Sequence, residues 1–338
     1  MKLRITLSLI IILILLIFAG SAIYLHTRVP NVNFTPIVAD TFSNKIRISY
    51  IAHVTTSSKY CGKILQTKAV IYHRRDEEKI EQQGSRKYPV WSITRGDHSY
   101  TFIANENTLL ISDTSRLISE KQRKKLFLEN YEARYAGMDE VAGRRTWVVN
   151  LIARRRERPA KKLWIDLKTY VILRSIDYSS TGDERSRTQI SKIIYNPVFD
   201  PAKFVLPESK SIERITVCKS SNPTALFGSL GFNVIRPRYV PSGYRLEGYH
   251  LFNSRCACKH LTAQLTYTDG LNVISVFESP IMTACAESCN MRGSGHGGCD
   301  VGGCEIACTG SVVRKDKTVV VVGDLLPDEI KKIAKSVD

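Results

Sequence analysis

Residues Asn130 to Tyr178 have the sequence NYEARYAGMDEVAGRRTWVVNLIARRRERPAKKLWIDLKTYVILRSIDY. Residue types that favour strands, which are β-branched, aromatic and aliphatic, fill Arg145 to Ala153 and Leu163 to Leu173. Turn-forming residues separate these runs at Ala142-Gly143 and at Arg158-Pro159. The stretch therefore predicts three consecutive antiparallel strands, which together would build a broad, curved sheet.

Four short motifs in and beyond this stretch have the order and spacing of a known family. They are Tyr131-Glu132, Val141-Ala142-Gly143-Arg144, Leu163-Trp164-Ile165-Asp166 and Asp200-Pro201-Ala202-Lys203-Phe204. Over residues 45 to 207 the chain resembles the MucB/RseB and LolA group, the periplasmic sigma-E regulators and lipoprotein carriers. The resemblance implies an open antiparallel half-barrel, LolA-like, whose concave side takes lipid or acyl chains.

The chain before and after the central stretch shows further strand signals. Alternating apolar and polar residues, or runs of β-branched residues, predict strands at Ile46–Val54, Ile64–His73, Ser92–Ile111 (turning at Gly96-Asp97 and Asn105–Asn107) and Thr188–Tyr195. The one helix predicted in this region is Arg116 to Leu128, whose middle is charged. Residues 35–207 are thus predicted to form the half-barrel domain.

A smaller domain is predicted after a linker at residues 208–223. Its signals are a short helix at Thr224–Phe227, a hairpin of Ala263–Tyr267 and Val273–Phe277 around Asp269-Gly270, a strand at Thr318–Val322, and a helix from Pro327. Residues 224–338 would then be a cysteine-rich α+β domain with an insert at 254–310 that departs from the family pattern. The predicted fold class is mainly β with α+β: an open antiparallel half-barrel followed by this domain, as in the MucB/RseB branch.

The segment Met1 to Leu25 predicts export. Lys2 and Arg4 precede an apolar run from Ile5 to Phe18, as in a signal peptide. If the run extends to Leu25 it reaches about 20 residues, enough to span a bilayer. Residues 1–27 are therefore either a cleaved signal peptide or an N-terminal membrane anchor. Both place the rest of the chain in the periplasm or at the extracytoplasmic face of the inner membrane.

The charge of the chain favours an anionic partner. With 338 residues and a net charge of +17, the protein is long enough for two domains and strongly basic. Acidic lipid, acidic protein surfaces and nucleic acid would all suit such a charge. Export removes the chain from most nucleic acid, so no nucleic acid partner is expected.

The chain has nine cysteines, which in an exported protein favour disulfides. An even set of eight, sufficient for four bridges, consists of Cys218, Cys256, Cys258, Cys285, Cys289, Cys299, Cys304 and Cys308. Cys61 is left over as a free thiol. A zinc site or a thiol-redox module remains open as an alternative, although the spacings lack the CxxC of a zinc ribbon. No metal or other cofactor is predicted.

Basic residues crowd the predicted hairpin tip of the central stretch: Arg154, Arg155, Arg156, Arg158, Lys161 and Lys162. Planar guanidinium groups can hold phosphate or carboxylate through paired hydrogen bonds. The cluster is therefore a candidate site for an anionic headgroup or an acidic partner segment. A solvated turn in a basic protein is the alternative interpretation.

Four aromatic residues are candidates for an apolar ligand site. Trp147 and Trp164 lie on neighbouring predicted strands, and with Tyr50 and Tyr72 they could line a concavity fit for acyl chains. Ordinary sheet core is the alternative. No catalytic set is found: Asp97, His98 and Ser99 are adjacent on a strand or turn, where successive side chains point to opposite faces. The chain is predicted not to be an enzyme.

The combined hypothesis is an exported protein that senses or carries a lipid or lipoprotein. The resemblance to MucB/RseB implies, as a partner, the periplasmic segment of a membrane anti-sigma factor. Two alternatives remain open, a LolA-type carrier without a regulatory role and a metal or thiol-redox module in the cysteine-rich domain.

Overall fold

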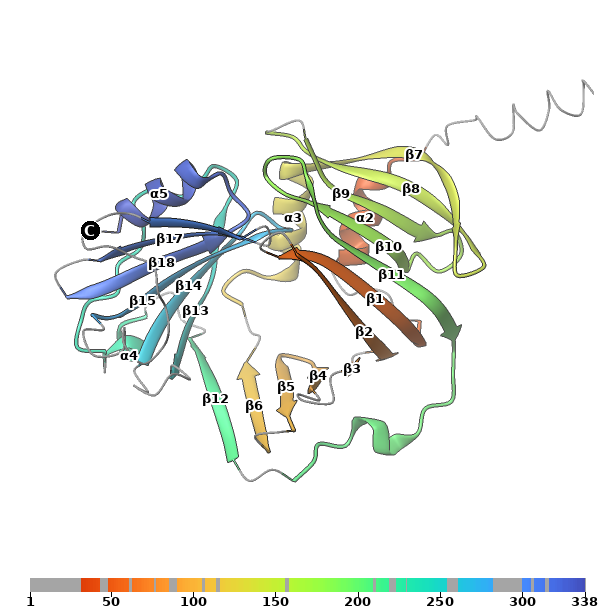
Figure 1. The fold of residues 1–338 in the computed structure, drawn as a ribbon, viewed down its shortest axis with the longest axis horizontal. Helices are drawn as coiled ribbons and strands as arrows, with labels where there is room; N and C mark the ends of the chain where they lie inside the picture. Colours follow the sequence, from red (N-terminus) through yellow and green to blue (C-terminus); the bar gives the residue numbers. More distant parts are fainter. Residues whose placement is uncertain are drawn as a thin grey trace, which may run out of the picture.

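The computed structural model describes residues 32–42, 48–60, 63–75, 77–84, 90–104, 107–113, 116–155, 158–208, 211–218, 223–228, 230–253, 261–281, 300–304, 307–313 and 316–337. Figure 1 shows a larger curved sheet from β1 to β11 and a smaller sheet on the left, in blue. In the described part of the chain, no helix combines the length and the apolar character needed to cross a bilayer. The predicted export segment lies outside the described residues.

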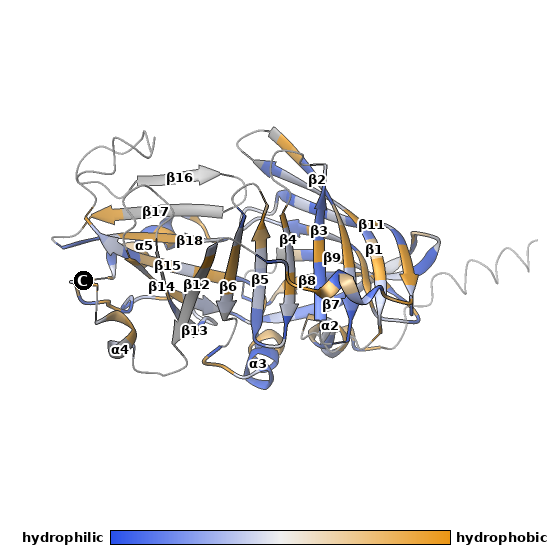
Figure 2. Cartoon of the chain, turned by 90° about the horizontal axis from the view of Figure 1, so that it is seen from below, coloured by the Kyte–Doolittle hydropathy of each residue, from blue (hydrophilic) through white to orange (hydrophobic). Residues whose placement is uncertain are grey.

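The larger sheet is antiparallel and open. Its strands are β1 (Tyr50–Tyr60), β2 (Lys63–Arg74), β3 (Glu77–Gln83), β4 (Val90–Arg95), β5 (His98–Ile103), β6 (Thr108–Asp113), β7 (Tyr131–Val141), β8 (Arg144–Ala153), β9 (Arg158–Asp166), β10 (Ile172–Tyr178) and β11 (Glu184–Tyr195). They pair in the order β7-β8-β9-β10-β11-β1-β2-β3-β4-β5-β6. Hydrophobic and hydrophilic residues alternate along many of these strands (Figure 2). The predicted open half-barrel is confirmed.

The central stretch contains four strands, not the three predicted. The predicted turn at Ala142-Gly143 is confirmed, because both residues have positive φ values, 53° and 71°. A second break separates β9 from β10, where the Asp166 carboxylate accepts the backbone N–H groups of Lys168 (2.8 Å) and Thr169 (3.1 Å). Arg158-Pro159 was predicted to turn but instead opens β9, because the turn lies earlier, after Ala153.

Several elements arise where no element was predicted, and α2 and β3 show why. The helix α2 (Phe34–Phe42) is rich in β-branched residues, which are poor helix formers, but Phe34 and Val38 are fully buried. The strand β3 has the sequence EEKIEQQ and forms between β2 and β4, both of which pair with it. Tertiary packing and strand pairing therefore override local propensity in both elements.

Two helices pack against one face of the larger sheet, hereafter the helix-covered face. The helix α3 (Glu120–Asn130) confirms the predicted helix and begins at a capping box, in which Ser119 and Gln122 exchange side-chain and backbone hydrogen bonds of 3.2 and 2.7 Å. Residues from α2, α3, β7, β8 and β9 form one buried cluster that includes Phe34, Phe127, Val149, Leu163 and Ile165. This cluster is the main core of the β7–β9 region.

Arg144 and Asp166, which belong to two of the motifs that carry the family resemblance, meet in the folded chain. They form an ion pair whose second contact joins Arg144 Nη2 and Asp166 Oδ1 at 3.2 Å. Burial by itself would raise the pKa of Asp166, but Arg144 and the two turn N–H groups outweigh burial and hold that pKa below its usual value. The pair ties the β7–β8 turn to the β9–β10 turn.

We expect Asp166→Asn to lower the free energy of unfolding at neutral pH by about 2 kcal/mol, because charged hydrogen bonds are lost. Since the pKa of Asp166 is lowered by folding, its contribution is present above the unfolded-state pKa and is lost as pH falls through the folded-state value. The difference between wild type and variant should therefore shrink in acid. Urea unfolding at a series of pH values measures it, and a difference that stays constant into acid would contradict the assignment.

The smaller sheet contains the elements predicted for the C-terminal region, together with three strands that were not predicted, β13, β16 and β17. Its strands and helices are β13 (Arg245–Asn253), β14 (Leu261–Thr268), β15 (Val273–Pro280), β16 (Asp300–Cys304), β17 (Ala307–Val313), β18 (Lys317–Gly323), α4 (Thr224–Phe227) and α5 (Pro327–Lys335). The strands pair in the order β13-β14-β15-β18-β17-β16. Ile330, Ile333 and Ala334 of α5 are fully buried in the core.

One strand connects the two sheets. β12 (Ser211–Cys218) pairs in parallel with β6 through Ser211–Ile215 and antiparallel with β13 through Thr216–Cys218. Figure 1 shows it between β6 and β13. The segment predicted as a linker, residues 208–223, thus contains a strand that is hydrogen-bonded to both parts of the molecule.

Most of the predicted disulfide cysteines lie outside the described residues, as do Cys61 and residues 254–260, 282–299 and 305–306 of the insert at 254–310. The cysteines outside are Cys61, Cys256, Cys258, Cys285, Cys289 and Cys299. The backbone of Cys218, Cys304 and Cys308 lies in β12, β16 and β17. The four predicted bridges stay a prediction.

Candidate functional site

A cavity of about 90 Å³ lies where the half-barrel meets the C-terminal part. The half-barrel contributes Asn130 and Tyr131 at the junction of α3 and β7, and Arg155, Lys161 and Arg185 from β8, β9 and β11 or their turns. The C-terminal part contributes residues of three loops, including Ser242, Tyr244, Asp269, Asn272 and Asp324. The cavity is therefore built jointly by segments that are far apart in sequence.

Asn130 joins the two parts through its side-chain amide. Its Nδ2 donates to the carbonyl oxygens of Leu126 (2.9 Å), Gly243 (3.1 Å) and Asp269 (3.0 Å). The first acceptor lies in α3 and the other two lie in the C-terminal part. The amide thus closes the last turn of α3 and binds two loops of the neighbouring sheet.

Tyr131 continues this interface. Its hydroxyl donates to Asp269 Oδ2 (2.5 Å) and accepts from Asn272 Nδ2 (2.9 Å), while its ring is buried against Phe127. Burial, followed by the charge of Asp269, raises the pKa of Tyr131 well above its ordinary value. The hydroxyl therefore stays protonated and keeps donating across the physiological pH range.

The turn between β14 and β15 packs directly on α3. Gly270 in this turn has φ +98°, and a Cβ atom built there would lie 2.7 Å from Phe127 Cα and closer still to Phe127 N. Gly243, also at φ +98°, would bring a Cβ to 3.1 Å from Asn130 Cγ. Both loops thus approach α3 more closely than any side chain would allow.

Ion pairs lie on both sides of this contact. Arg185 Nη1 lies 3.2 Å from Asp324 Oδ2, and the backbone N–H of Ser180 donates to Asp324 Oδ1 at 3.1 Å. On the other side, Arg116 Nε lies 3.2 Å from Glu247 Oε1. The larger sheet therefore supplies cations and the smaller sheet supplies carboxylates.

Only part of the predicted basic cluster reaches the cavity. Arg155 and Lys161 line it, although Arg155 Nε donates to Asn130 Oδ1 at 3.5 Å and Lys161 pairs with Asp177. Arg154 Nε donates to the carbonyl oxygen of Tyr131 at 3.0 Å. Arg156 lies outside the described residues, and the backbone of Arg158 begins β9.

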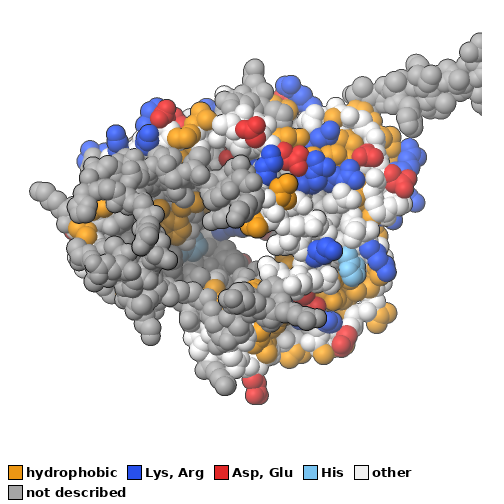
Figure 3. Space-filling model, viewed as in Figure 1, with side chains coloured by type: hydrophobic (Ala, Val, Ile, Leu, Met, Phe, Trp, Pro, Cys, Tyr) orange, Lys and Arg blue, Asp and Glu red, His pale blue; other side chains and the backbone are white. Residues whose placement is uncertain are grey.

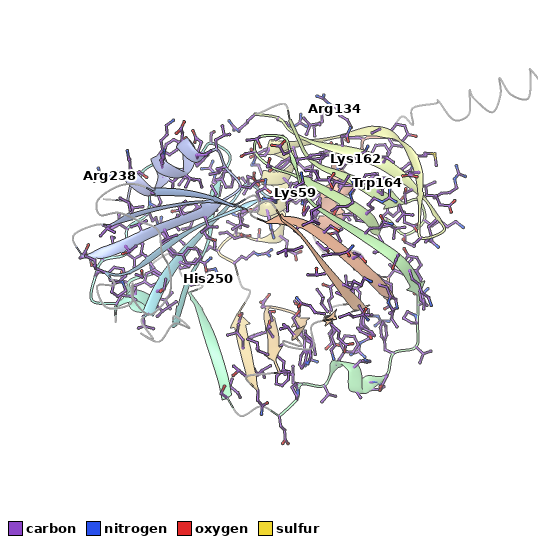
Figure 4. The ribbon with its side chains drawn as sticks, in the orientation of Figure 1. Lys59, Arg134, Lys162, Trp164, Arg238 and His250 are labelled. Atoms are coloured by element: carbon purple, nitrogen blue, oxygen red, sulfur yellow. The ribbon has the colours of Figure 1, made fainter. Side chains whose placement is uncertain are left out.

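Lys162 does not line the cavity, because successive side chains of β9 point to opposite faces of the sheet and Lys161 is the neighbour that lines it. Lys162 Nζ lies 5.3 Å from the centre of the Trp164 ring, and Figure 4 shows the two side by side. Arg174 lies over the same ring at 4.9 Å, and Trp164 Nε1 donates to Asp139 Oδ2 at 2.8 Å. Trp164 is thus a buried core residue, in one cluster with Val148 and Ile176, that is flanked by charged groups.

The four predicted aromatic residues do not line one concavity. Trp147 packs edge-on against Phe34 of α2, with ring centres 5.3 Å apart, and so lies on the helix-covered face. Trp164 lies between Leu163 and Ile165, which both face α2, so Trp164 points to the opposite face. The sequence placed the two tryptophans on neighbouring strands correctly but could not assign their faces.

The two tyrosines are divided in the same way. Tyr50 packs against the same buried cluster as Trp164, which also contains Ala52 and Leu173. Tyr72 pairs with Ile51, the neighbour of Tyr50, and lies on the opposite face. Tyr50 stacks on His73 with ring centres 4.8 Å apart, and burial raises its pKa.

The residues that join the two parts of the molecule were not identified as a site from the sequence. Asp269-Gly270 was recognised as a turn, but nothing local shows that this turn meets Asn130 and Tyr131, more than a hundred residues earlier. Within the described ranges, no group of three or more His, Cys, Asp or Glu side chains could hold a metal ion. The site offers hydrogen bonds and charges for binding.

Charge is distributed over the visible surface of the half-barrel. Figure 3 shows Lys and Arg side chains in several places on the right-hand part, with Asp and Glu among them. The net charge of +17 is therefore spread over the surface as well as gathered in clusters. Such a surface attracts anionic partners over a range set by ionic strength.

Comparison with known proteins finds similarity to the MucB/RseB family, which the sequence motifs also indicated. A family model for the MucB/RseB N-terminal domain matches residues 56–208. The structure of the Pseudomonas aeruginosa MucA/MucB complex superimposes with a TM-score of 0.61 at 17% identity, covering 89% of this chain and 96% of that chain. No curated protein sequence matches the chain significantly.

Two further MucB structures also superimpose on this chain. MucB in complex with MucA(peri) superimposes with a TM-score of 0.58 and MucB with 0.56, each at 17% identity over 89% of this chain and 96% and 94% of theirs. At this identity the superpositions establish a shared fold that includes both sheets. The resemblance to the MucB/RseB and LolA group predicted from the sequence is confirmed, and residues 56–208 match the MucB/RseB N-terminal domain.

Proposed function

We propose that this protein is a non-enzymatic, extracytoplasmic regulator of the MucB/RseB type, which binds a lipid or lipoprotein and the periplasmic segment of a membrane anti-sigma factor. The observation that carries the proposal is the match of residues 56–208 to the MucB/RseB N-terminal domain, together with a shared fold over 89% of the chain with MucB structures. Two of those structures contain MucA as the partner of MucB.

The geometry supports a ligand on the helix-covered face. The helices pack on the β7–β9 region, and half-buried apolar residues such as Ile71 and Ile80 pair across the strands β2 and β3 of the same sheet. An apolar chain entering here would bury surface at roughly 25 cal/mol per Å². Trp147 lies on this face, where it packs against Phe34.

The geometry also supports an anionic group at the interface of the two parts. Arg155 and Lys161 line the cavity, and Arg154 lies at the same hairpin. An anionic headgroup or an acidic peptide bound here would contact both sheets. Ligand binding would thereby be coupled to the contact between the half-barrel and the C-terminal part.

A native pull-down followed by lipid mass spectrometry tests this function. The exported chain is isolated from its own membranes in mild detergent, and co-purifying proteins and lipids are identified. We expect a membrane protein with an extracytoplasmic segment together with acyl-chain lipid. Lipoprotein without a membrane regulator would favour the carrier alternative, and absence of both lipid and partner would overturn the proposal.

Replacing Arg154, Arg155, Arg156 and Arg158 by Gln is expected to weaken association with the anionic partner or lipid and to flatten its salt dependence. Thermal stability should change little, because exposed charges contribute little to folding. Titration of the lipid or the purified partner segment at several salt concentrations measures both effects. Unchanged affinity at low salt would leave only the solvated-turn interpretation of this cluster.

A further inference from the structure

An array of aromatic rings lies where the chain enters α2. Phe34, the first residue of α2, stacks on Tyr135 with ring centres 5.7 Å apart and packs edge-on against Trp147 at 5.3 Å. Tyr170, from the turn between β9 and β10, extends the array with its ring centre 5.9 Å from that of Trp147. Phe34 is buried, Tyr135 and Trp147 are half-buried, and Tyr170 is 44% exposed. The three outer rings, Tyr135, Trp147 and Tyr170, are called the aromatic patch below.

Tyr170 occupies its position at a cost to folding. Its φ of 61° lies in the left-handed region, which is unfavourable for a residue with a large side chain. The turn holds it there, because its N–H donates to the carbonyl oxygen of Asp166 at 3.0 Å and the carbonyl oxygen of Val171 accepts the Asp166 N–H at 2.9 Å. The ring is nevertheless exposed, so core packing does not account for it. A backbone outlier that presents an aromatic ring to solvent points to a role at the surface.

The aromatic patch lies near the end of the predicted export segment. Asn33 Oδ1 accepts the N–H of Thr35 at 3.1 Å at the start of α2, and Val32 before it is 43% exposed. Val32 follows Leu25, the last residue of the apolar segment, by seven residues. Seven residues span at most about 25 Å, whatever their conformation. If the apolar segment stays in a bilayer, α2 and the patch are therefore held within this distance of the membrane.

The charges around the patch are nearly balanced. Arg145 in β8 and Lys168 in the β9–β10 turn are exposed, but Glu140 is also exposed and lies directly opposite Arg145 in the strand register. The neighbouring Asp139 is paired with Arg174 at 3.2 Å. A ligand of the patch would therefore be bound by the rings and not by net charge. Tyr and Trp combine an apolar body with a polar edge, which suits the boundary between headgroups and acyl chains.

We infer that residues 1–25 stay in the membrane as an anchor and that the aromatic patch docks on the surface of the same bilayer. A tether of this length gives the patch a high effective concentration at the surface, so a weak intrinsic affinity is sufficient. Figure 1 shows α3 between α2 and the smaller sheet, so docking would leave the C-terminal part at a distance from the patch. This inference goes beyond the proposed function, which holds whether or not the segment is cleaved.

Tryptophan fluorescence of the full chain, with one chain in each lipid nanodisc, tests the docking. Lipids that carry a nitroxide at the headgroup should quench Trp147. Trp147→Phe should abolish this quenching, because Trp91 lies in β4 and Trp164 is buried on the other face of β9. Phosphatidylcholine alone should act like phosphatidylethanolamine mixed with phosphatidylglycerol, since the charges of the patch are balanced. Quenching confined to the anionic mixture would show an electrostatic contact and overturn docking by the rings.

Variants of Tyr170 separate docking from stability. Tyr170→Asn should lose most of the quenching, whereas its melting temperature should stay the same or rise, because Asn adopts left-handed conformations more readily than Tyr. Tyr170→Phe should keep the quenching. Tyr239→Asn is the matched control, since Tyr239 is 36% exposed in the C-terminal part, and it should leave quenching unchanged. Equal quenching in wild type and Tyr170→Asn would contradict the assignment.

The state of the N-terminal segment decides the other half of the inference. Mass spectrometry of the chain isolated from the cell envelope should find residues 1–25 intact, in the membrane fraction. A chain that begins after Ala22 and is recovered as a soluble protein would overturn the inference. An unquenched Trp147 in a disc that holds one intact chain would also overturn it, and would leave the patch to a second copy or to another protein.

Discussion

Gly270→Ala is expected to separate the two parts of the molecule and to lower the free energy of unfolding by about 3 kcal/mol. The residue has φ +98°, a backbone conformation that costs an L-residue about 1–2 kcal/mol. An alanine Cβ would in addition lie 2.7 Å from Phe127 Cα, and backbone atoms of α3 cannot move aside as a flexible side chain would. The β14–β15 turn would then have to leave α3, taking Asp269 away from Asn130 and Tyr131.

Gly182→Ala is the matched control for this change. Gly182 has φ +95°, and nothing lies within 4 Å of a Cβ built there, so the control carries the backbone strain without the contact. Urea unfolding measures stability, and small-angle scattering measures the separation of the two parts. We also expect faster proteolysis within residues 208–223 in Gly270→Ala. Similar behaviour of the two variants would show that the close packing on α3 does not hold the parts together.

Glu278→Leu is expected to lower the free energy of unfolding by about 3–5 kcal/mol. This is the usual cost of removing one member of a buried ion pair and leaving the other charge without its partner. Glu278 is 0% exposed and Lys317 is 2% exposed, and Lys317 Nζ lies 2.6 Å from Glu278 Oε2. Glu278 also accepts the backbone N–H of Ile235 at 3.1 Å. Removing the carboxylate would leave the buried Lys317 ammonium without its counter-charge, with the Asn233 carbonyl oxygen at 2.8 Å as a neutral acceptor, and would take away the acceptor of the Ile235 N–H.

The double change Glu278→Leu with Lys317→Met should recover much of this loss, because two apolar side chains of similar volume replace the pair. Glu184→Leu is the control, since Glu184 forms an exposed pair with Arg187 and should cost less than about 1 kcal/mol. Chemical unfolding of the wild type, the single variants Glu278→Leu and Lys317→Met, and the double variant gives the coupling energy. A double variant less stable than either single variant would show that the pair is not the source of the effect.

Local sequence determined the elements whose signals are contained within a few residues. The turn at Ala142-Gly143 and the β14–β15 hairpin at Asp269-Gly270 both form where a glycine, Gly143 or Gly270, accepts positive φ without strain. The helix α5 starts at Pro327, where a missing N–H costs nothing. The spaced motifs from Tyr131 to Phe204 were also sufficient to predict the MucB/RseB resemblance, because short motifs in a fixed order survive low overall identity.

Elements that depend on partners far away in sequence could not be predicted. The helix α2 has poor helix formers and is held by burial of Phe34 and Val38 against β7 and β8. The strand β3 is rich in glutamate and is held by two neighbouring strands. The faces of Trp147, Trp164, Tyr50 and Tyr72 follow from strand register, because a shift of one residue moves a side chain to the other face.

The sequence by itself therefore determined the fold class, the meander of the central stretch and the basic character of the surface, since these follow from residue type, spacing and charge. Only the tertiary structure decided which residues form a site. Asn130, Tyr131 and Asp269 meet because α3 packs on the β14–β15 turn. Contacts of this kind depend on how the elements pack, which local patterns do not encode.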